Sequence, residues 1–529
     1  MEKQGMLSEK GPADKGHLVY LIMLLHGVGT LMPWNMFITI APAYFVNYKL
    51  METDEQGVRH STPYSRNFFS YLGICSQLPC LLMNLINIFI ESKTPLIGNP
   101  VVSGYDNKGL QQSTLAIPFE QSAMRGRTYP LPELGSRVRP ERSSSIRRAH
   151  STLFAVDVPA ALLPLPLAYL QDYPSHLFIR RGGLVRRIAV SLVVVGCICV
   201  ITLLLVLVDT SHMVTTFFLI TMITVMILNG ANGIYQNSIF GLVSAFPQQF
   251  TNAIVVGNNL CGTFVSLINI VTLLVADTIE VAAVGYFAIA LLTVAACFGS
   301  VFILPKLDFY RYYQNKAAES HKDIDLDQPN KPNASKLQLY LDVFKQVWVQ
   351  CMNVFLTFFV TLTIFPAIMA EIKLYRADGK YDFILPEFLF TPVTTFLLFN
   401  LLAMIGSTVA NFVQWPSPRF LSIPVLIRLS LIPLMMFCNY RPARRTWPVY
   451  FTSEYVYFVF AIIMSFTNGY FSSLGMMYAP KSVDKSKAAV AGMMSAFFLI
   501  FGICCGVAFT FFVAYFTDYL GPNAQLLLP

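Results

Sequence analysis

One apolar stretch of the chain holds an unusual number of amide side chains. It is the run NGANGIYQNSIFGL at 229–242, where Asn229, Asn232 and Gln236 recur at i, i+3 and i+7 and share one helical face. An amide in an apolar environment needs a hydrogen-bond partner or water. These side chains therefore predict a polar cavity inside an apolar bundle. Hydrogen bonds between helices, without any ligand, are the alternative use of the same face.

The first apolar run combines residues for close packing with residues for recognition. It reads HGVGTLMPWNMF, in which Gly27 and Gly29 allow another helix to approach and Pro33 frees backbone carbonyls. Trp34 offers a flat stacking face, and Asn35 offers hydrogen bonds. A binding site for a flat polar molecule and ordinary helix packing with an aromatic plug both remain open for this run.

Polar residues with helical spacing recur in later apolar runs. Asn400, Ser407 and Asn411 lie at i, i+7 and i+11, Gln77 lies two residues before a proline, and Asn468 precedes a glycine. Amides and small residues on one face suit either a polar pathway or tight packing between helices. We therefore treat them as candidates for lining or gating a cavity.

Ionisable residues inside the apolar runs are few. Arg428 lies near the middle of a run, whereas Glu371 and Glu454 lie near the ends of theirs. The absence of a carboxylate in the middle of a run argues against a proton relay or an acidic sodium site, and so favours downhill movement of a solute. For Arg428, a structural role that ties helices together through carbonyls outweighs contact with a substrate.

The motifs of catalysis and of cofactor binding are missing from the sequence. It contains no hydrolytic triad pattern, no phosphate-binding glycine loop and no cluster with metal-ligand spacing. We therefore predict that the protein is not an enzyme and has no catalytic residues, no metal and no cofactor.

Composition places the chain in a membrane. Of its 529 residues, 55% are apolar and only 12% are charged, and the mean hydropathy is +0.56. So few charges cannot cover a protein surface in water, whereas a surface that faces lipid needs none. The net charge of +8 does not indicate nucleic-acid binding, because the basic residues lie between the apolar runs. The predicted surroundings are therefore a lipid bilayer, and no nucleic-acid partner is expected.

Eleven runs reach the length of about 20 residues that a membrane-spanning helix needs. We therefore predict an all-α polytopic membrane protein. The predicted spans are 18–46, 67–91, 187–209, 213–245, 251–276, 280–304, 345–371, 387–414, 419–438, 449–478 and 488–518.

The distribution of Lys and Arg predicts a cytosolic N-terminus and, after eleven spans, an extracellular C-terminus. The basic cluster at Arg441–Arg445 goes against this rule, because it falls on the outer side. The predicted parts are a cytosolic tail (1–16), a six-helix half (17–304), a flexible cytosolic linker (305–344), a five-helix half (345–518) and an external tail (519–529).

A segment rich in Arg, Ser and Pro interrupts the first half at 92–186. Its one apolar piece is broken by prolines, so we predict a disordered cytosolic insert and not a further span. Its basic residues could contact anionic lipid headgroups. An insertion without function, from splicing or from an error in the gene model, is equally compatible with the sequence.

These residues together resemble the equilibrative nucleoside transporter family, solute carrier family 29. The resemblance covers nearly the whole chain except 92–186. It rests on GVGTLMPWNMF (27–37), SQLPC (76–80), GIYQNSIFGLVSAFP (233–247), FPAI (365–368), FN…G (399–406), QWP (414–416), IRLSLIPL (427–434) and FTNGYFSSLGMMYAPK (466–481). The family implies a pseudo-symmetric 6+5 bundle, similar to the major facilitator fold, that works by alternating access.

The resemblance also implies roles for single residues. Trp34 matches the tryptophan of the family's pocket, Gln236 the glutamine that hydrogen-bonds the base, and Asn400 the asparagine of the eighth-span motif FNxxDxxGR. The Asp and Arg of that motif grip the ribose, but here their positions hold Ala403 and Ser407. Both partners of the ion pair are absent together, so no unpaired charge is left behind.

Without that ion pair, neutral groups must supply the hydrogen bonds. Gln77, at a position that is commonly apolar in the family, and Ser407 are the candidates. The absence of the Asp also removes the obvious counter-ion for an organic cation.

The resemblance implies facilitative transport of nucleosides or nucleobases across the plasma membrane, with a small-molecule substrate. Two alternatives stay open. One is another small polar or cationic solute in the same fold, and the other is a transport-dead relative that acts as a sensor or scaffold. The sequence leaves the oligomeric state open.

Overall fold

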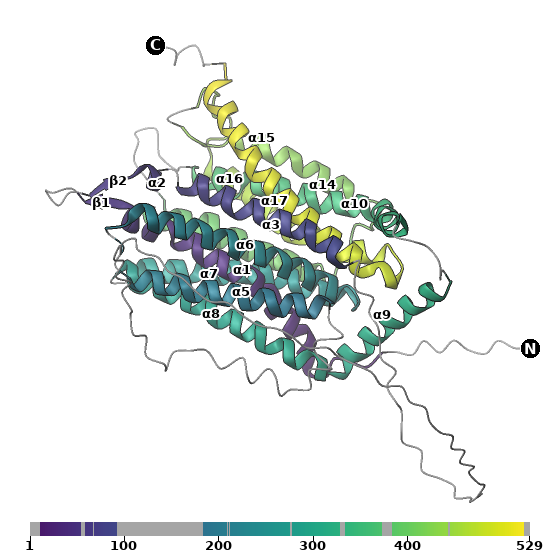
Figure 1. Ribbon diagram of the computed structural model, residues 1–529. Helices are drawn as coiled ribbons and strands as arrows, with labels where there is room; N and C mark the ends of the chain where they lie inside the picture. Colours follow the sequence, from purple (N-terminus) through teal and green to yellow (C-terminus); the bar gives the residue numbers. More distant parts are fainter. Residues whose placement is uncertain are drawn as a thin grey trace, which may run out of the picture. The chain divides into compact units, whose positions relative to one another are not determined.

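The computed structural model describes residues 11–53, 59–66, 68–91, 183–208, 210, 212–275, 278–327, 334–372, 383–442 and 445–522. Helices make up almost all of these ranges, which confirms the prediction of an all-α polytopic membrane protein (Figure 1). All but the last four residues of the predicted insert at 92–186 lie outside the described residues. The ends of both predicted tails, 1–10 and 523–529, lie outside them as well.

Ten helices in the described ranges are long and apolar enough to cross a membrane. They comprise α1 (Leu18–Ala41), α3 (Phe68–Glu91), α5 (Gly183–Leu207), α6 (Val214–Val243), α7 (Gln248–Val275), α8 (Ile279–Ile303), α10 (Ala334–Ile364), α12 with α13 (Glu387–Thr391 and Leu398–Val409), α16 (Glu454–Lys481) and α17 (Ala488–Tyr519). The predicted span at 419–438 is shorter and consists of α14 (Ser422–Ile427), a 3-10 turn at Arg428–Ser430 and α15 (Leu431–Met436). Eleven crossings therefore stay a prediction.

The remaining elements of the described chain are nine short ones and the 20-residue helix α9. They are η1 (Lys15–His17), η2 (Pro42–Lys49), β1 (Met51–Thr53), β2 (Arg59–Ser61), α2 (Pro63–Arg66), η5 (Leu304–Lys306), α9 (Asp308–Asp327), α11 (Ala367–Ala370), η6 (Pro392–Leu397) and η8 (Lys485–Lys487). The two strands form an antiparallel hairpin in which Met51 pairs with Ser61 and Thr53 with Arg59.

The segment predicted as a flexible linker is largely helical. Helix α9 occupies Asp308–Asp327, and α10 already begins at Ala334. Phe309 at the start of α9 packs on Phe250 of α7 with ring centroids 4.7 Å apart, and both rings are buried. This aromatic contact docks α9 against the bundle, which its polar composition did not indicate.

Glycines set the helix pairing in the first half. Gly27 of α1 faces Gly257 of α7, and a Cβ at either position would meet backbone of the other helix. The pairing is parallel, because Tyr20 packs on Phe250 near one end and Asn35 lies 3.5 Å from Cys261 Sγ further along. Helices α3 and α6 also run side by side in parallel.

The second half repeats this pattern. Helices α10 and α17 run in parallel, and Cβ atoms at Gly502 and Gly506 would meet the carbonyls of Phe355 and Phe359. Helices α13 and α16 form the other close pair, in which Gly469 lies against the backbone of Ala403. In both halves, therefore, the first helix pairs closely with the fifth, and the second with the fourth.

We call the end of the bundle where α1 and α7 begin and α6 and α16 end the basic end. Here lie Lys481, Lys485, Lys487 and the helix α9. At the opposite end, the basic cluster that disagreed with the charge rule is compensated locally. Arg441 pairs with Glu371, and its Nη1 lies 2.7 Å from Asp518 Oδ2. Arg445 donates hydrogen bonds to backbone carbonyls, among them Cys438 O at 2.7 Å.

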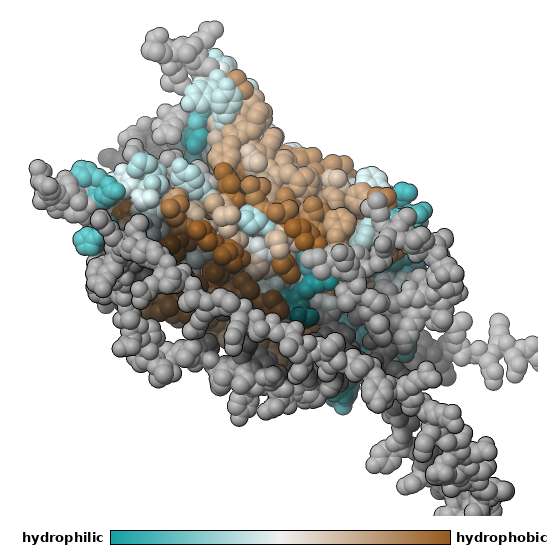
Figure 2. All heavy atoms as spheres, in the orientation of Figure 1, coloured by the Kyte–Doolittle hydropathy of each residue, from teal (hydrophilic) through white to brown (hydrophobic). Residues whose placement is uncertain are grey.

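The outer face of the helices is apolar. Figure 2 shows apolar side chains over the middle of the visible face, and Leu78, Leu82, Val193 and Leu204 are among the exposed large hydrophobic residues. Exposed apolar area of this extent would be unstable in water but suits lipid.

The glycine contacts lead to a first prediction. Changing Gly469 to valine should strongly reduce the amount of folded protein, because even the Cβ would meet the backbone of Ala403 and push α13 from α16. Detergent-solubilised protein on size-exclusion chromatography, and its melting temperature, measure the effect. The matched control is Gly285→Val, because a Cβ at Gly285 meets no atom within 4 Å. Equal behaviour of the two variants would contradict the proposed contact.

Candidate substrate site

The predicted recognition residues of α1 lie midway along the helix. Trp34 is half-buried and lies nearly parallel to the ring of Phe37, with an interplanar angle of 6° and centroids 6.4 Å apart. Pro33 is buried, and Asn35 makes only a weak contact with Cys261. The indole of Trp34 is therefore partly exposed, while Asn35 contacts α7.

The amide face of α6 divides into groups with and without protein partners. Asn229 Nδ2 donates to the carbonyl of Val225 at 2.9 Å, so the amino group of this amide has a partner within its own helix. Asn232 Oδ1 is buried and has no hydrogen-bond partner among the described residues. Gln236 is 2% exposed, and its side chain makes no hydrogen bond within the described part of the chain. A buried amide without a partner is costly, so Asn232 and Gln236 are the positions where a polar ligand or water would gain most.

The neighbouring Asn237 has a different task. It accepts a hydrogen bond from Asn87 Nδ2 of α3 at 2.8 Å and donates to the carbonyl of Met493 of α17 at 2.9 Å. It therefore connects the two halves near the basic end. Gln77 of α3 is half-buried, and its backbone carbonyl makes a further contact between the halves, 3.8 Å from Cys504 Sγ of α17. Its side-chain amide approaches Ser76 Oγ only at 3.5 Å.

Helices α7 and α13 meet along a row of polar contacts that we call the α7–α13 seam. Asn252 Nδ2 donates to Ser407 O at 2.6 Å and to Asn411 Oδ1 at 2.9 Å. One step further along, Asn259 Nδ2 lies 3.2 Å from Ser407 Oγ and 3.4 Å from the carbonyl of Ala403.

The third contact of the seam joins Asn400 to Ser266. Asn400 Nδ2 donates to Ser266 Oγ at 3.3 Å and to the carbonyl of Phe396 at 2.9 Å. Gly262 leaves room for this amide, because a Cβ there would overlap Asn400. The donors and acceptors of α7 thus recur at 252, 259 and 266, which is one helical face with a period of seven.

The seam changes the interpretation of Ser407. This side chain is fully buried, donates to Met404 O at 2.9 Å and accepts from Asn259. In this conformation the hydroxyl is thus occupied by protein groups, and a substrate could reach it only after the seam opens. The predicted role of Ser407 as a donor to substrate stays a prediction.

Arg428 sits in a network without carboxylates. Its guanidinium donates to the carbonyls of Thr357 and Met464, at 3.3 and 3.2 Å, and to Thr361 Oγ1 at 3.0 Å. Thr361 in turn donates to Asn468 Oδ1 at 2.9 Å. The network joins α10, α16 and the broken helix around Arg428, so this arginine and Asn468 occupy structural positions in the described conformation.

The comparison with known proteins decides the family. Residues 222–515 match the family model described as nucleoside transporter, which is more than half of the chain. The chain belongs to the nucleoside transporter family.

Some relatives of this nucleoside transporter family member align with nearly its full length, and others with a large part of it. Human equilibrative nucleoside transporter 1 is 29% identical over 533 aligned residues, which cover 96% of this chain and 99% of the relative. Human equilibrative nucleoside transporter 2 is 26% identical, with 94% and 97% covered. Rat equilibrative nucleoside transporter 3 is 30% identical over 65% of this chain and 76% of its own.

Sequence reasoning missed the asparagines on α7 of this nucleoside transporter family member. Asn258 accepts a hydrogen bond from Thr30 of α1 at 2.8 Å, while the adjacent Asn259 bonds α13. Four asparagines in the apolar run 251–276, with Asn252 and Asn259 seven residues apart, are the signal in the sequence.

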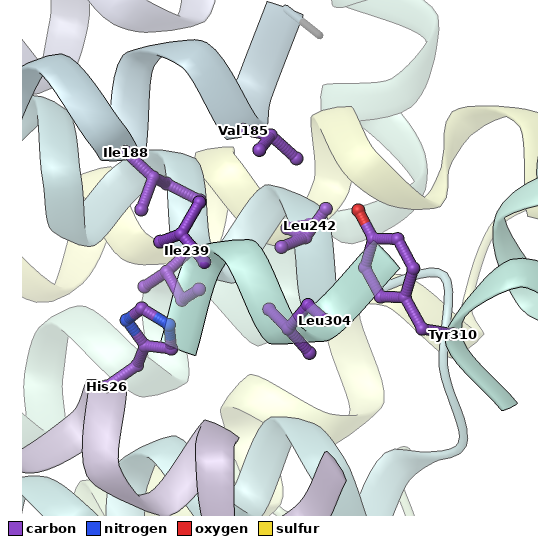
Figure 3. Close-up of a pocket in the computed structure, with 8 residues that line it drawn as sticks. His26, Val185, Ile188, Ile239, Leu242, Leu304 and Tyr310 are labelled. Atoms are coloured by element: carbon purple, nitrogen blue, oxygen red, sulfur yellow. The ribbon is translucent and has the colours of Figure 1, made fainter. Parts of the chain in front are cut away.

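His26 also has defined partners. Its Nδ1 lies 2.6 Å from Tyr235 Oη and its Nε2 lies 3.0 Å from Ser300 Oγ, so both ring nitrogens are occupied. Beside it lies a cavity of about 10 Å³, lined mainly by apolar side chains such as Ile188, Ile239 and Leu242 (Figure 3). Such a space holds about one water molecule, so it is no site for a nucleoside.

Proposed function

We propose that this protein transports nucleosides or nucleobases down their concentration gradient by alternating access. The observation that supports this most directly is the buried amide face of α6. Among the described residues, the buried Asn232 Oδ1 has no partner and the buried Gln236 side chain makes no hydrogen bond, in a chain that belongs to the nucleoside transporter family. A base edge offers the donors and acceptors that such amides need.

Trp34 and Gln236 have complementary roles in this proposal. The half-exposed indole of Trp34 stacks on the base, and the amide of Gln236 reads the edge of the base. Asn400 and Ser407 become available to the sugar when the α7–α13 seam opens. Gln77 contributes a neutral amide from α3.

The glycines and Pro33 act on the scaffold instead. Gly27 fixes α1 against α7, Gly29 makes room for Cys297 and Tyr235, and Pro33 with Asn35 shapes α1 beside Cys261. In the same way Arg428 and Asn468 keep three helices of the second half together. Each half can then move as a unit around the site.

The described conformation is held together at the basic end and in the middle. Among the hydrogen bonds between halves, those from Asn237 to Met493 and from Gln248 to Met477 lie at the basic end, while the α7–α13 seam and the contact of Cys504 Sγ with the Gln77 carbonyl lie further along the helices. In the proposed orientation the basic end is cytosolic, as the positive-inside rule requires, and the C-terminus is extracellular. The site then opens outward while these contacts close the inner side, in the plasma membrane.

Transport by purified protein in liposomes tests the proposal. We expect saturable uptake of labelled uridine, adenosine or adenine, equal in both directions and without accumulation under a proton or sodium gradient. The measurement is initial rate and final level, with protein-free liposomes as the control. Concentrative uptake would overturn the downhill mechanism.

The same assay separates the alternatives. No flux of any nucleoside or base by correctly folded protein would favour a sensor or scaffold, which the occupied Ser407 would also fit. Flux of an organic cation that competes with uridine would point to a different solute. Melting temperature measured beside the flux shows whether the protein is folded.

A further inference from the structure

A cavity of about 430 Å³ lies at the basic end. The end of α6 and start of α7 contribute Phe246 and Gln248, α9 contributes Tyr312 and Lys316, and the second half contributes Lys481 and Lys485. The volume falls in the range of about 300–1,000 Å³ that small-molecule sites occupy. We call this cavity the basic vestibule. It is separate from the α6 amide face, because Gln236 does not line it.

The vestibule is lined by lysines. Lys316, Lys481 and Lys485 lie in its wall, and the described residues of the lining include no Asp or Glu. Neither Lys481 nor Lys485 has an ion-pair partner among the described residues. The nearby Lys487 differs, because its Nζ lies 3.8 Å from Asp484 Oδ2 and it does not line the cavity. The ammonium groups of Lys481 and Lys485, which have no ion pair in the described part of the chain, favour an anion with more than one negative charge at this cavity.

The walls of the vestibule are partly aromatic. Phe246 packs edge-on against Tyr313 with centroids 6.1 Å apart, and Tyr312 lies beside Tyr313 at 5.2 Å. The Nζ of Lys316 lies 3.2 Å from Tyr312 Oη and 5.3 Å from the centre of its ring. One ligand can therefore place a phosphate near the lysines and a flat ring against the tyrosines at the same time.

We propose that the basic vestibule binds a phosphate monoester with an aromatic body, of which a nucleoside monophosphate is the simplest. Lysines bind phosphate as point charges, and the tyrosine rings offer a stacking surface to the base. Because Phe246 and Lys481 belong to different halves, a bound molecule touches both. Its predicted effect is to hold the halves in the described conformation and to slow transport from the basic side, a consequence that depends on the proposed function.

Binding is tested on purified full-length protein by isothermal titration calorimetry. Adenosine monophosphate should bind, inorganic phosphate more weakly, and adenosine should not displace the nucleotide from the vestibule. The double variant Lys481→Gln plus Lys485→Gln should weaken binding by roughly tenfold or more, because charge-assisted hydrogen bonds are lost. Raising the salt concentration should weaken it as well.

The matched control is Lys487→Gln, since Lys487 lies in the same short helix but is paired with Asp484. This variant should bind adenosine monophosphate like the unchanged protein. Equal loss in the control and in the double variant would overturn the assignment to the vestibule, and so would unchanged binding in the double variant. These outcomes do not depend on any transport measurement.

A second arm separates free nucleotide from lipid. The protein is reconstituted into phosphatidylcholine vesicles with or without phosphatidylinositol bisphosphate, whose headgroup offers the same phosphate chemistry. Binding of adenosine monophosphate that is present in pure phosphatidylcholine supports the nucleotide. Failure to bind it in either membrane, with a melting temperature that rises only with the phosphoinositide, would overturn the nucleotide in favour of lipid.

The consequence for transport has its own readout. Adenosine monophosphate added at the basic side should lower uridine flux several-fold, and the double lysine variant should resist this inhibition while keeping its basal flux. If neither protein transports uridine but adenosine monophosphate still binds, the proposed function fails and the vestibule stands. If transport occurs and the nucleotide does not bind, the vestibule proposal fails alone.

Discussion

The Gln236→Ala variant should show an apparent KM for purine nucleosides about tenfold higher than that of the unchanged protein. Gln236 is almost completely buried on α6 and makes no hydrogen bond to protein groups in the described residues. An alanine there removes the donor and acceptor that the proposed site offers to a base. The base, once desolvated, then keeps polar atoms without partners. Uptake kinetics of adenosine and inosine measure the change.

The control for this prediction is Asn229→Ala on the same face of α6. Asn229 Nδ2 is engaged by the carbonyl of Val225 in its own helix, so removal of this side chain should leave the KM close to that of the unchanged protein. Melting temperatures of both variants should lie close together, because neither side chain makes a hydrogen bond to another helix in the described part of the chain. An unchanged KM in Gln236→Ala, with transport intact, would remove this residue from the site.

The pair Ala403→Asp and Ser407→Arg should show strong coupling between its two changes. Both positions are fully buried on α13, so either charge alone is left uncompensated and should destabilise the protein by several kcal/mol. The two positions are i and i+4 on one helix, so together they can form an ion pair. We expect the double variant to recover much of the stability that each single variant loses, and to bind uridine more tightly.

A double-mutant cycle measures this coupling. Melting temperature and uridine uptake are determined for both single variants and the double variant. Each single variant should lose folded protein. The new side chain disturbs the bonds of Asn259 to Ser407 Oγ and to the carbonyl of Ala403, and the neutral amide of Asn259 cannot compensate the new charge. Additive losses in the double variant would show that the two side chains do not interact, and would contradict the proposed geometry of the sugar site.

The fold was predictable where apolar length alone determines it. Runs such as 187–209 and 280–304 correspond closely to α5 and α8, because lipid requires long continuous apolar helices. Boundaries were wrong where a helix continues in polar residues, as in α10, which begins at Ala334 and not at 345. The helix α9 was missed because its docking through Phe309 is a tertiary contact that hydropathy does not encode.

The candidate site was predictable in its residue types but not in its partners. Spacing placed Asn229, Asn232 and Gln236 on one face, yet only the structure shows that Asn229 Nδ2 bonds its own helix, whereas the buried Asn232 Oδ1 has no partner among the described residues. Likewise, nothing in the pattern around Ser407 indicated that Asn259 would occupy it. Which polar groups meet across a helix interface depends on register and rotation, which a single sequence leaves undetermined.

The chemistry of the α7–α13 seam bears on how the membrane potential acts on this protein. The side chains that form the seam, from Asn252 to Ser266 and from Asn400 to Asn411, are all neutral amides or hydroxyls. Moving one elementary charge through a membrane involves about 2.3 kcal/mol per 100 mV, whereas an amide carries no net charge. In the proposed transport cycle, the membrane potential would therefore move no net charge when the contacts of the seam open and close. The free energy of opening the α7–α13 seam should therefore be the same in a resting cell and in a depolarised cell.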